Sequence, residues 1–176
     1  MHPWHDVSYG DHTPEIVNGI IEIPSGTKAK YEVDKKTGLL KLDRVLFSAV
    51  FYPCNYGFIP QTLCGDGDPL DILVFSSVSM ERLSLLEARV IGVMRMTDEG
   101  ATDDKIIAVP KSDVYVAHIN SIEDLPPHTL PELRRFFEYY QILEGQKVVV
   151  EGFYGKQKAY EILADNIKAY AEKFKP

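Results

Sequence analysis

The residues best suited to chemistry are three aspartates in one short turn. Residues 65–71 read GDGDPLD, so the carboxylates of Asp66, Asp68 and Asp71 fall within six positions with no basic residue among them. Two carboxylates about 4 Å apart repel each other by about 4 kcal/mol at an effective dielectric of about 20, so such a cluster takes up a proton or binds a cation. Hard, oxygen-seeking Mg²⁺ or Mn²⁺ is the natural counter-ion.

The chain around these aspartates is stiff. Gly67 permits a tight turn, and Pro69 fixes φ just before an apolar run. A string of this composition also occurs in ordinary solvated turns, so by itself it leaves function open. A calcium-binding EF-hand loop is disfavoured, because its sixth and twelfth positions need Gly and Glu, where this chain has Asp71 and Ser77.

A second acidic segment and several cations could complete a site. Residues 98–105 read DEGATDDK and follow an apolar run that ends at Met96. Such a loop is usually only solvated, so it becomes functional if it lies beside the first aspartates. Lys30 and Arg44 are candidates to hold phosphate oxygens, arginine in a bidentate manner, although single residues of this kind are most often surface cations.

Short strands and two later helices must position these side chains. Apolar runs separated by turn residues predict β-strands at Ile20–Ile23, Tyr31–Val33, Leu39–Leu42, Val45–Phe51, Leu70–Phe75, Ala88–Met96, Ile106–Val109 and Lys147–Val150. A capping box at Thr129 and apolar residues at helical spacing predict a helix up to Gly145, and a second stripe predicts one over Lys156–Phe174. The fold class is α+β, with an antiparallel barrel that is closed or partly closed.

Composition narrows the function. With 176 residues, 45% of them hydrophobic, we expect a single domain over residues 1–176. The net charge of −7 opposes sequence-independent binding of nucleic acid, which needs a basic face. No apolar run approaches the roughly 18 to 20 residues that span a bilayer, so we expect no membrane segment and a cytoplasmic location.

The aspartate turn resembles a known family. DGDPLD at residues 66–71 is similar to the signature of the family I soluble inorganic pyrophosphatases of prokaryotic type. Six more blocks resemble that family in its order, from roughly residue 20 to 165: Ile21–Pro24, Lys30–Glu32, Asp43–Arg44, Phe51–Gly57, Met96–Asp98 and Phe136–Tyr140.

The resemblance implies a fold and a reaction. It implies a five-stranded OB-like closed β-barrel flanked by C-terminal helices, several Mg²⁺ ions at its mouth, with Mn²⁺ as a possible substitute, and a homohexamer. The implied activity is Mg²⁺-dependent hydrolysis of pyrophosphate to two phosphates, by in-line attack of a metal-activated water.

The resemblance also implies roles for individual residues. Metal ligation falls to Glu22, Glu32, Asp66, Asp71, Asp98 and Asp103, with Asp103 preferred to Asp104 by its spacing from Asp98. Asp68 resembles the residue that orients or deprotonates the attacking water. Phosphate contacts fall to Lys30, Arg44, Lys105 and Tyr140, with Tyr56 beside them and Tyr52 in support. The catalytic set is therefore Asp68, Tyr56, Arg44 and Lys30.

One departure and two alternatives stay open. The family usually has lysine after the helical tyrosine, where this chain has Gln141, and we expect weaker phosphate binding or faster product release there. The first alternative is a metal-dependent phosphohydrolase acting on a nucleotide or another polyphosphate. The second is an OB-type module that binds single-stranded nucleic acid or oligosaccharide, of which the negative charge disfavours the nucleic-acid version.

Overall fold

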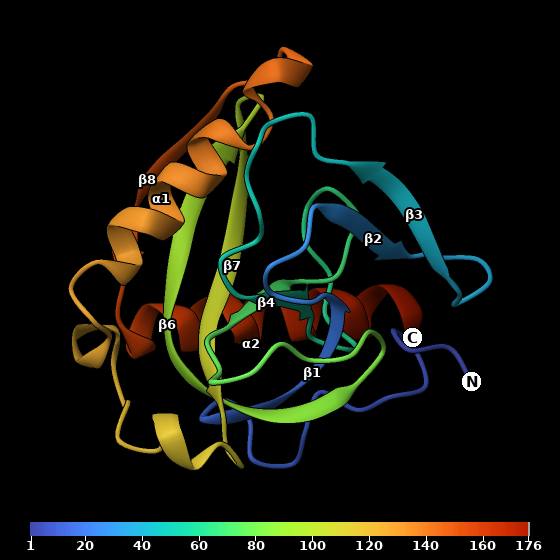
Figure 1. Cartoon of the computed structure of the whole chain (residues 1–176). Helices are drawn as coiled ribbons and strands as arrows, with labels where there is room; N and C mark the ends of the chain where they lie inside the picture. Colours follow the sequence, from blue (N-terminus) through green and yellow to red (C-terminus); the bar gives the residue numbers. More distant parts are fainter. Residues whose placement is uncertain (176) are drawn as a thin grey trace.

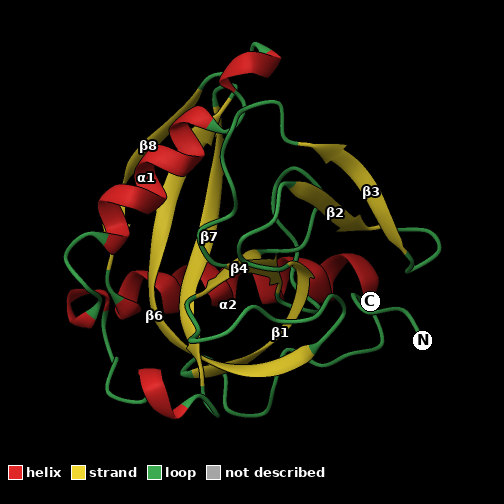
Figure 2. Cartoon of the chain, in the orientation of Figure 1, coloured by secondary structure: helices red, strands yellow, loops and turns green. Residues whose placement is uncertain are grey.

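The computed structural model describes residues 1–175, which form eight strands, two α-helices and three short 3-10 turns (Figures 1 and 2). The strands are β1 (Ile16–Ile23), β2 (Ala29–Val33), β3 (Leu40–Val45), β4 (Asn55–Phe58), β5 (Asp71–Val74), β6 (Leu85–Asp98), β7 (Ala101–Pro110) and β8 (Val148–Tyr154). The helices are α1 (Thr129–Tyr139) and α2 (Lys156–Phe174), and the 3-10 turns are Val114–Val116, Ile122–Asp124 and Ile142–Glu144.

Five strands close into a ring. Their order is β1-β4-β5-β7-β6, and a further pairing between β1 and β6 joins the two ends, while β8 extends the sheet from β6. The expectation of a five-stranded closed barrel is therefore confirmed. The pairings are antiparallel except between β5 and β7, which run parallel, so the expectation of a purely antiparallel barrel is wrong at this one place.

The strands β2 and β3 form a separate two-stranded hairpin beside the ring (Figure 1). Lys30 lies opposite Arg44 in its register, so the hairpin places two cations side by side. Its turn, residues 34–38, is held by the Asp34 side chain, which accepts from the Thr37 backbone N–H at 2.8 Å and the Thr37 hydroxyl at 2.7 Å.

One predicted strand is wrong and one was missed. Residues 46–51 of the expected strand Val45–Phe51 are irregular, although the run is apolar, and Phe47 and Phe51 are exposed. The real strand is β4, which contains Asn55 and Gly57, both poor strand formers. Gly57 is required because a Cβ there would lie 1.9 Å from the Ile20 carbonyl oxygen of β1. Close backbone approach within the ring outweighed local propensity.

The helices differ from expectation only at α1. Thr129 is the first helical residue rather than the cap, and His128 precedes it with no side-chain capping bond, so the predicted capping box is absent. The helix ends at Tyr139 instead of reaching Gly145, and a separate 3-10 turn fills Ile142–Glu144. Because the helix ends early, Tyr140 and Gln141 lie at its C-terminal end. The bounds of α2 match the prediction.

The core lies on both faces of the sheet. On β5, Leu73 packs in a cluster with Phe136 and Phe137 of α1, whereas its neighbours Ile72 and Val74 pack in a cluster with α2. This alternation is the period-two pattern of strands buried on both sides. None of the helices within residues 1–175 combines the length and apolarity that crossing a bilayer requires.

Candidate active site

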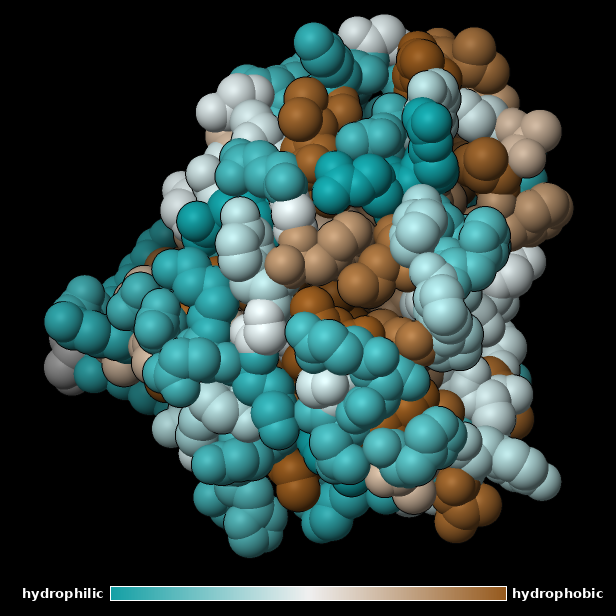
Figure 3. Space-filling view, turned by 90° about the vertical axis from the view of Figure 1, so that its left-hand side faces the viewer, coloured by the Kyte–Doolittle hydropathy of each residue, from teal (hydrophilic) through white to brown (hydrophobic). Residues whose placement is uncertain are grey.

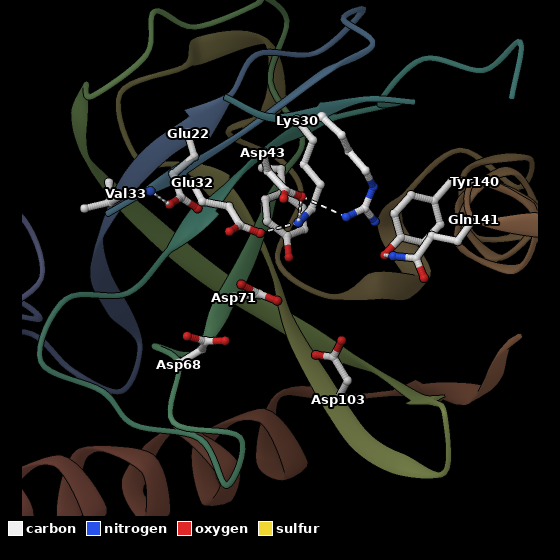
Figure 4. A network of polar contacts seen from close by, with 12 residues as sticks. Glu22, Lys30, Glu32, Val33, Asp43, Asp68, Asp71, Asp103, Tyr140 and Gln141 are labelled. Atoms are coloured by element: carbon white, nitrogen blue, oxygen red, sulfur yellow. Dashed lines mark hydrogen bonds and ion pairs between the residues drawn. The ribbon is translucent and has the colours of Figure 1, made fainter. Parts of the chain in front are cut away.

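Thirteen of the fourteen side chains assigned to the site from the sequence line one cavity of about 330 Å³, whereas Tyr52 does not line it and is buried in the hydrophobic core against Phe136. The thirteen come from the strands β1 to β7, the loop before β5 and the end of α1: Glu22, Lys30, Glu32, Arg44, Tyr56, Asp66, Asp68, Asp71, Asp98, Asp103, Lys105, Tyr140 and Gln141. Figure 4 shows the carboxylates of Glu32, Asp68, Asp71 and Asp103 around a common space. The two acidic segments thus meet, although 27 positions separate Asp71 from Asp98.

The parallel pairing of β5 and β7 sets the cavity floor. Asp71, the first residue of β5, lies opposite Lys105 of β7. Asp103 precedes Lys105 by two positions and therefore shares its face of the strand. Asp104 points to the other face, where Arg95 donates to its two oxygens at 2.8 Å each. Asp103, and not Asp104, lines the cavity.

Lys105 is the buried cation of this floor. Its side chain is 3% exposed, and its Nζ donates to Asp71 Oδ2 at 2.6 Å, to both oxygens of Asp103 at 3.1 Å and to the Tyr56 hydroxyl at 3.1 Å. Burial opposes its charge, but the Asp103 and Asp71 carboxylates outweigh burial and hold the pKa of Lys105 well above its usual range. Lys105 is therefore a fixed positive charge.

A second cationic cluster lies on the β2–β3 hairpin. Asp43 Oδ2 accepts from Lys30 Nζ at 3.0 Å and from Arg44 Nη1 at 2.8 Å, and Lys30 also pairs with Glu32. Burial opposes the charge of Lys30, yet Glu32 and Asp43 raise its pKa above the ordinary value. Glu144, whose side chain is 10% exposed, pairs with Arg44 Nε. Both cations are held in place by carboxylates, and Lys30 keeps its charge.

Glu22 is the buried carboxyl of the site. It is 7% exposed, and the Val33 backbone N–H donates to its Oε1 at 2.7 Å (Figure 4). Burial raises the pKa of Glu22 to about 8, with the Val33 hydrogen bond acting in the opposite direction. At neutral pH this residue is mostly protonated, unless a cation at the site draws the proton off.

Among the aspartates of the site that form an ion pair, Asp68 has the most exposed side chain. Its side chain is 49% exposed, and it pairs with Lys35 of the hairpin turn. Asp66 Oδ1 accepts from the Asp68 backbone N–H at 2.9 Å, which fixes the turn locally. A half-exposed carboxylate at the cavity can accept a proton from a water molecule once Lys35 moves aside.

Two tyrosines supply neutral hydroxyl groups. Burial raises the pKa of Tyr140 to about 12 and that of Tyr56 well above its usual range, so both remain protonated at neutral pH. Gln141 Nε2 donates to the Tyr140 hydroxyl oxygen at 2.7 Å. The hydroxyl proton of Tyr140 is thereby left free to be donated elsewhere.

The side chains fit hard metal cations. Seven carboxylates and four cationic groups, Lys30, Lys35, Arg44 and Lys105, line the cavity, which leaves three negative charges in surplus, or two with Glu22 protonated. An oxygen-only donor set with surplus negative charge suits Mg²⁺ or Mn²⁺. Within residues 1–175, no three acidic, histidine or cysteine side chains are already drawn together as a metal cluster.

Sequence reasoning missed three residues that shape the site. Lys35 lines the cavity, while Asp43 and Glu144 hold the two hairpin cations from outside it. The hairpin pairing of β2 and β3 is a signal that could have linked Asp43 to Lys30. Glu144 follows the helix end, and nothing in the sequence connects it to Arg44, because 100 positions separate them.

Comparison with known proteins gives one consistent result. Residues 19–171 match the family described as Inorganic pyrophosphatase. The chain is 48% identical to "Soluble inorganic pyrophosphatase 2" of Chlamydomonas reinhardtii over 99% of this chain and 91% of that one. It is 49% identical to "Soluble inorganic pyrophosphatase 1" of Arabidopsis thaliana over 97% of this chain and 81% of the relative.

Solved structures agree with the sequence relatives. The inorganic pyrophosphatase of Thermus thermophilus superposes with a TM-score of 0.90 at 42% identity, over 93% of this chain and 96% of that one. The inorganic pyrophosphatase of Helicobacter pylori gives a TM-score of 0.89 at 43% identity, over 94% of this chain and 98% of the other.

Proposed function

The chain belongs to the inorganic pyrophosphatase family, and from that premise we propose that it hydrolyses pyrophosphate to two phosphates in the cavity described above. One observation carries the assignment of the site. Thirteen residues that the family resemblance selects line a single cavity, although they come from seven strands, the loop before β5 and the end of α1. They bring together two acidic segments and the basic side chains of Lys30, Arg44 and Lys105.

The hairpin and the floor bind the substrate. Lys30 and Arg44 lie side by side on β2 and β3. Lys105 lies on β7, where it forms ion pairs with Asp71 and Asp103. Pyrophosphate is a compact polyanion, so these fixed charges orient it and stabilise the negative charge that develops on the leaving phosphate. Tyr140 and Tyr56, both protonated, add hydrogen bonds to phosphate oxygens without adding charge.

Asp68 handles the proton of the attacking water. Water attacks phosphorus in line with the leaving oxygen, the bridging P–O bond breaks, and a proton of the water passes to the Asp68 carboxylate. The exposure of this carboxylate supports the role, because water reaches it directly. Its pairing with Lys35 must open first, and the incoming phosphate groups offer Lys35 an alternative anion.

Metal dependence belongs to the family, and we propose Mg²⁺ as the ion, with Mn²⁺ as a substitute. The residues that would hold it are Glu22, Glu32, Asp66, Asp71, Asp98 and Asp103, all cavity-lining carboxylates. When bound, Mg²⁺ supplies acidification of water and neutralisation of phosphate charge. Asp98 fits the role of a metal ligand. Burial and the neighbouring Glu99 raise its pKa, which means that its charged form is disfavoured, and a bound cation would offset this penalty.

We also propose one domain, a homohexamer and a cytoplasmic location. The closed ring with α1 on one face and α2 on the other supports a single unit over residues 1–176. Figure 3, which views the side where β8 and α1 lie in Figure 1, shows hydrophobic residues at the surface among hydrophilic ones. Exposed Leu143, Val149 and Tyr154 offer apolar contacts to other copies. Light scattering after size-exclusion chromatography tests the assembly: a monomer contradicts it.

The activity is tested by comparing substrates. Purified chain is incubated with pyrophosphate or with a nucleoside triphosphate, each with Mg²⁺, with Mn²⁺ and with a chelator, and released phosphate is measured. We expect rapid metal-dependent release from pyrophosphate and little from the nucleotide. Preferential cleavage of the nucleotide would establish the alternative phosphohydrolase instead, and no release from either would remove the enzyme assignment.

A further inference from the structure

The end of α1 presents an unusual pair of polar groups to the cavity. Tyr140 is 5% exposed and Gln141 is 5% exposed, and both line the cavity. The carboxamide Nε2 of Gln141 donates to the Tyr140 hydroxyl oxygen at 2.7 Å. That oxygen therefore already accepts one bond, and its own hydrogen is available for an acceptor in the cavity.

The other end of the Gln141 carboxamide has no partner. Its Oε1 is buried and accepts no hydrogen bond from any described residue in 1–175. Figure 4 shows the carboxamide at the helix end, on the same side of the open space as Tyr140, with Asp71 and Asp103 across from it. A buried acceptor left unpaired is costly, so a ligand that brings an O–H donor is favoured there.

We propose that Tyr140 and Gln141 together recognise the protonated edge of a phosphate group. Tyr140 donates to a deprotonated phosphate oxygen, and Gln141 Oε1 accepts from the P–O–H of monohydrogen phosphate, the product of the proposed reaction. This inference rests on the proposed function, since it places phosphate in the same cavity. It assigns Gln141 a specificity-determining role: the site distinguishes monohydrogen phosphate from tetrahedral dianions that carry no hydrogen, such as sulfate.

The chemistry of the alternatives sharpens the proposal. Sulfate has the same shape and charge as monohydrogen phosphate but carries no hydrogen, so it leaves Gln141 Oε1 unpaired. A lysine at this position has donors only, and it would attract both dianions without distinguishing them. Sites built around a hydrogen bond reject analogues that lack the hydrogen far more strongly than apolar pockets reject a missing methylene.

Calorimetric titration of the Mg²⁺-loaded protein with inorganic phosphate and with sulfate tests this, at a mildly alkaline pH where monohydrogen phosphate predominates. We expect the wild type to bind phosphate at least about tenfold more tightly than sulfate. Gln141→Leu should bring that ratio close to one, and Gln141→Lys should strengthen both bindings while also lowering the ratio. Gln141→Glu keeps an acceptor, so its ratio should stay high although both affinities fall.

A matched control comes from the same cavity wall. Gln146 also lines the cavity, and Gln146→Leu should keep the wild-type ratio. The proposal is overturned if Gln141→Leu discriminates as well as the wild type, or if the wild type binds sulfate as tightly as phosphate or binds neither. Hydrolysis of pyrophosphate is assayed separately: an active wild type without discrimination overturns this inference alone, and discrimination without hydrolysis overturns the proposed function.

Discussion

Replacing Lys105 by methionine should destabilise the chain strongly when metal is absent. The side chain is 3% exposed, and its ammonium group compensates the carboxylates of Asp71 and Asp103, which are 23% and 26% exposed. Removing one partner of a buried ion pair costs about 3–5 kcal/mol. Because both carboxylates keep about a quarter of their exposure to water, we expect the lower end, about 3 kcal/mol. For a chain of this size, that lowers Tm by about 6–12 °C.

Chemical and thermal unfolding in a chelator measure the loss for Lys105→Met. Added Mg²⁺ should recover part of it, because the freed carboxylates bind a cation in the folded state only. Lys111→Met is the control: Lys111 pairs with Glu87 at the surface, where the side chains are 44% and 50% exposed, so the expected cost is below about 1 kcal/mol. Equal losses for the two variants, or a Lys105→Met loss that Mg²⁺ leaves unchanged, would refute the reasoning.

Two further predictions concern the ring and its buried carboxyl. Gly57→Ala places a Cβ 1.9 Å from the Ile20 carbonyl oxygen and should lower the free energy of unfolding in urea by about 3 kcal/mol or more. The control Gly65→Ala meets no neighbour and should change that free energy by less than about 0.5 kcal/mol. Similar changes for the two variants would contradict the close approach of β1 and β4. Folding raises the pKa of Glu22 from 4.5 to about 8. Between these two pH values the folded chain therefore holds more protons than the unfolded chain. In a chelator, the free energy of unfolding should fall by about 3–5 kcal/mol as the pH rises through this range. Glu22→Gln should remove this fall, and an unchanged pH slope in unfolding titrations would count against a buried Glu22.

The fold could be predicted where local pattern and tertiary packing agree. The stripe of α2 predicted both of its ends, because one apolar face packs on the sheet and the other faces water. The apolar run Val45–Phe51 wrongly predicted a strand, because several of its apolar residues are exposed beside a buried Leu46. The true strand β4 contains Gly57, whose place in the ring depends on how close β1 comes. The parallel pairing of β5 and β7 likewise depends on long-range contacts that local periodicity does not encode.

The candidate site was predictable in membership but not in its connections. Thirteen of the fourteen residues selected by motif order line one cavity, because an acidic turn and cationic strands carry their chemistry in residue type and spacing. Which groups pair with each other could not be read this way. Lys35 reaches Asp68 from the hairpin turn, and Glu144 reaches Arg44 from beyond α1. Such pairs join distant segments, so they depend on the folded arrangement.

The most direct test of the central claim is phosphate release from pyrophosphate, with and without Mg²⁺, by the wild type and by Asp68→Asn. The account predicts Mg²⁺-dependent hydrolysis by the wild type and a loss of about a hundredfold or more in kcat for the variant, with unchanged thermal unfolding, because the half-exposed Asp68 contributes little to stability. Hydrolysis by Asp68→Asn at the wild-type rate, or none by the wild type with Mg²⁺ or Mn²⁺, would contradict it.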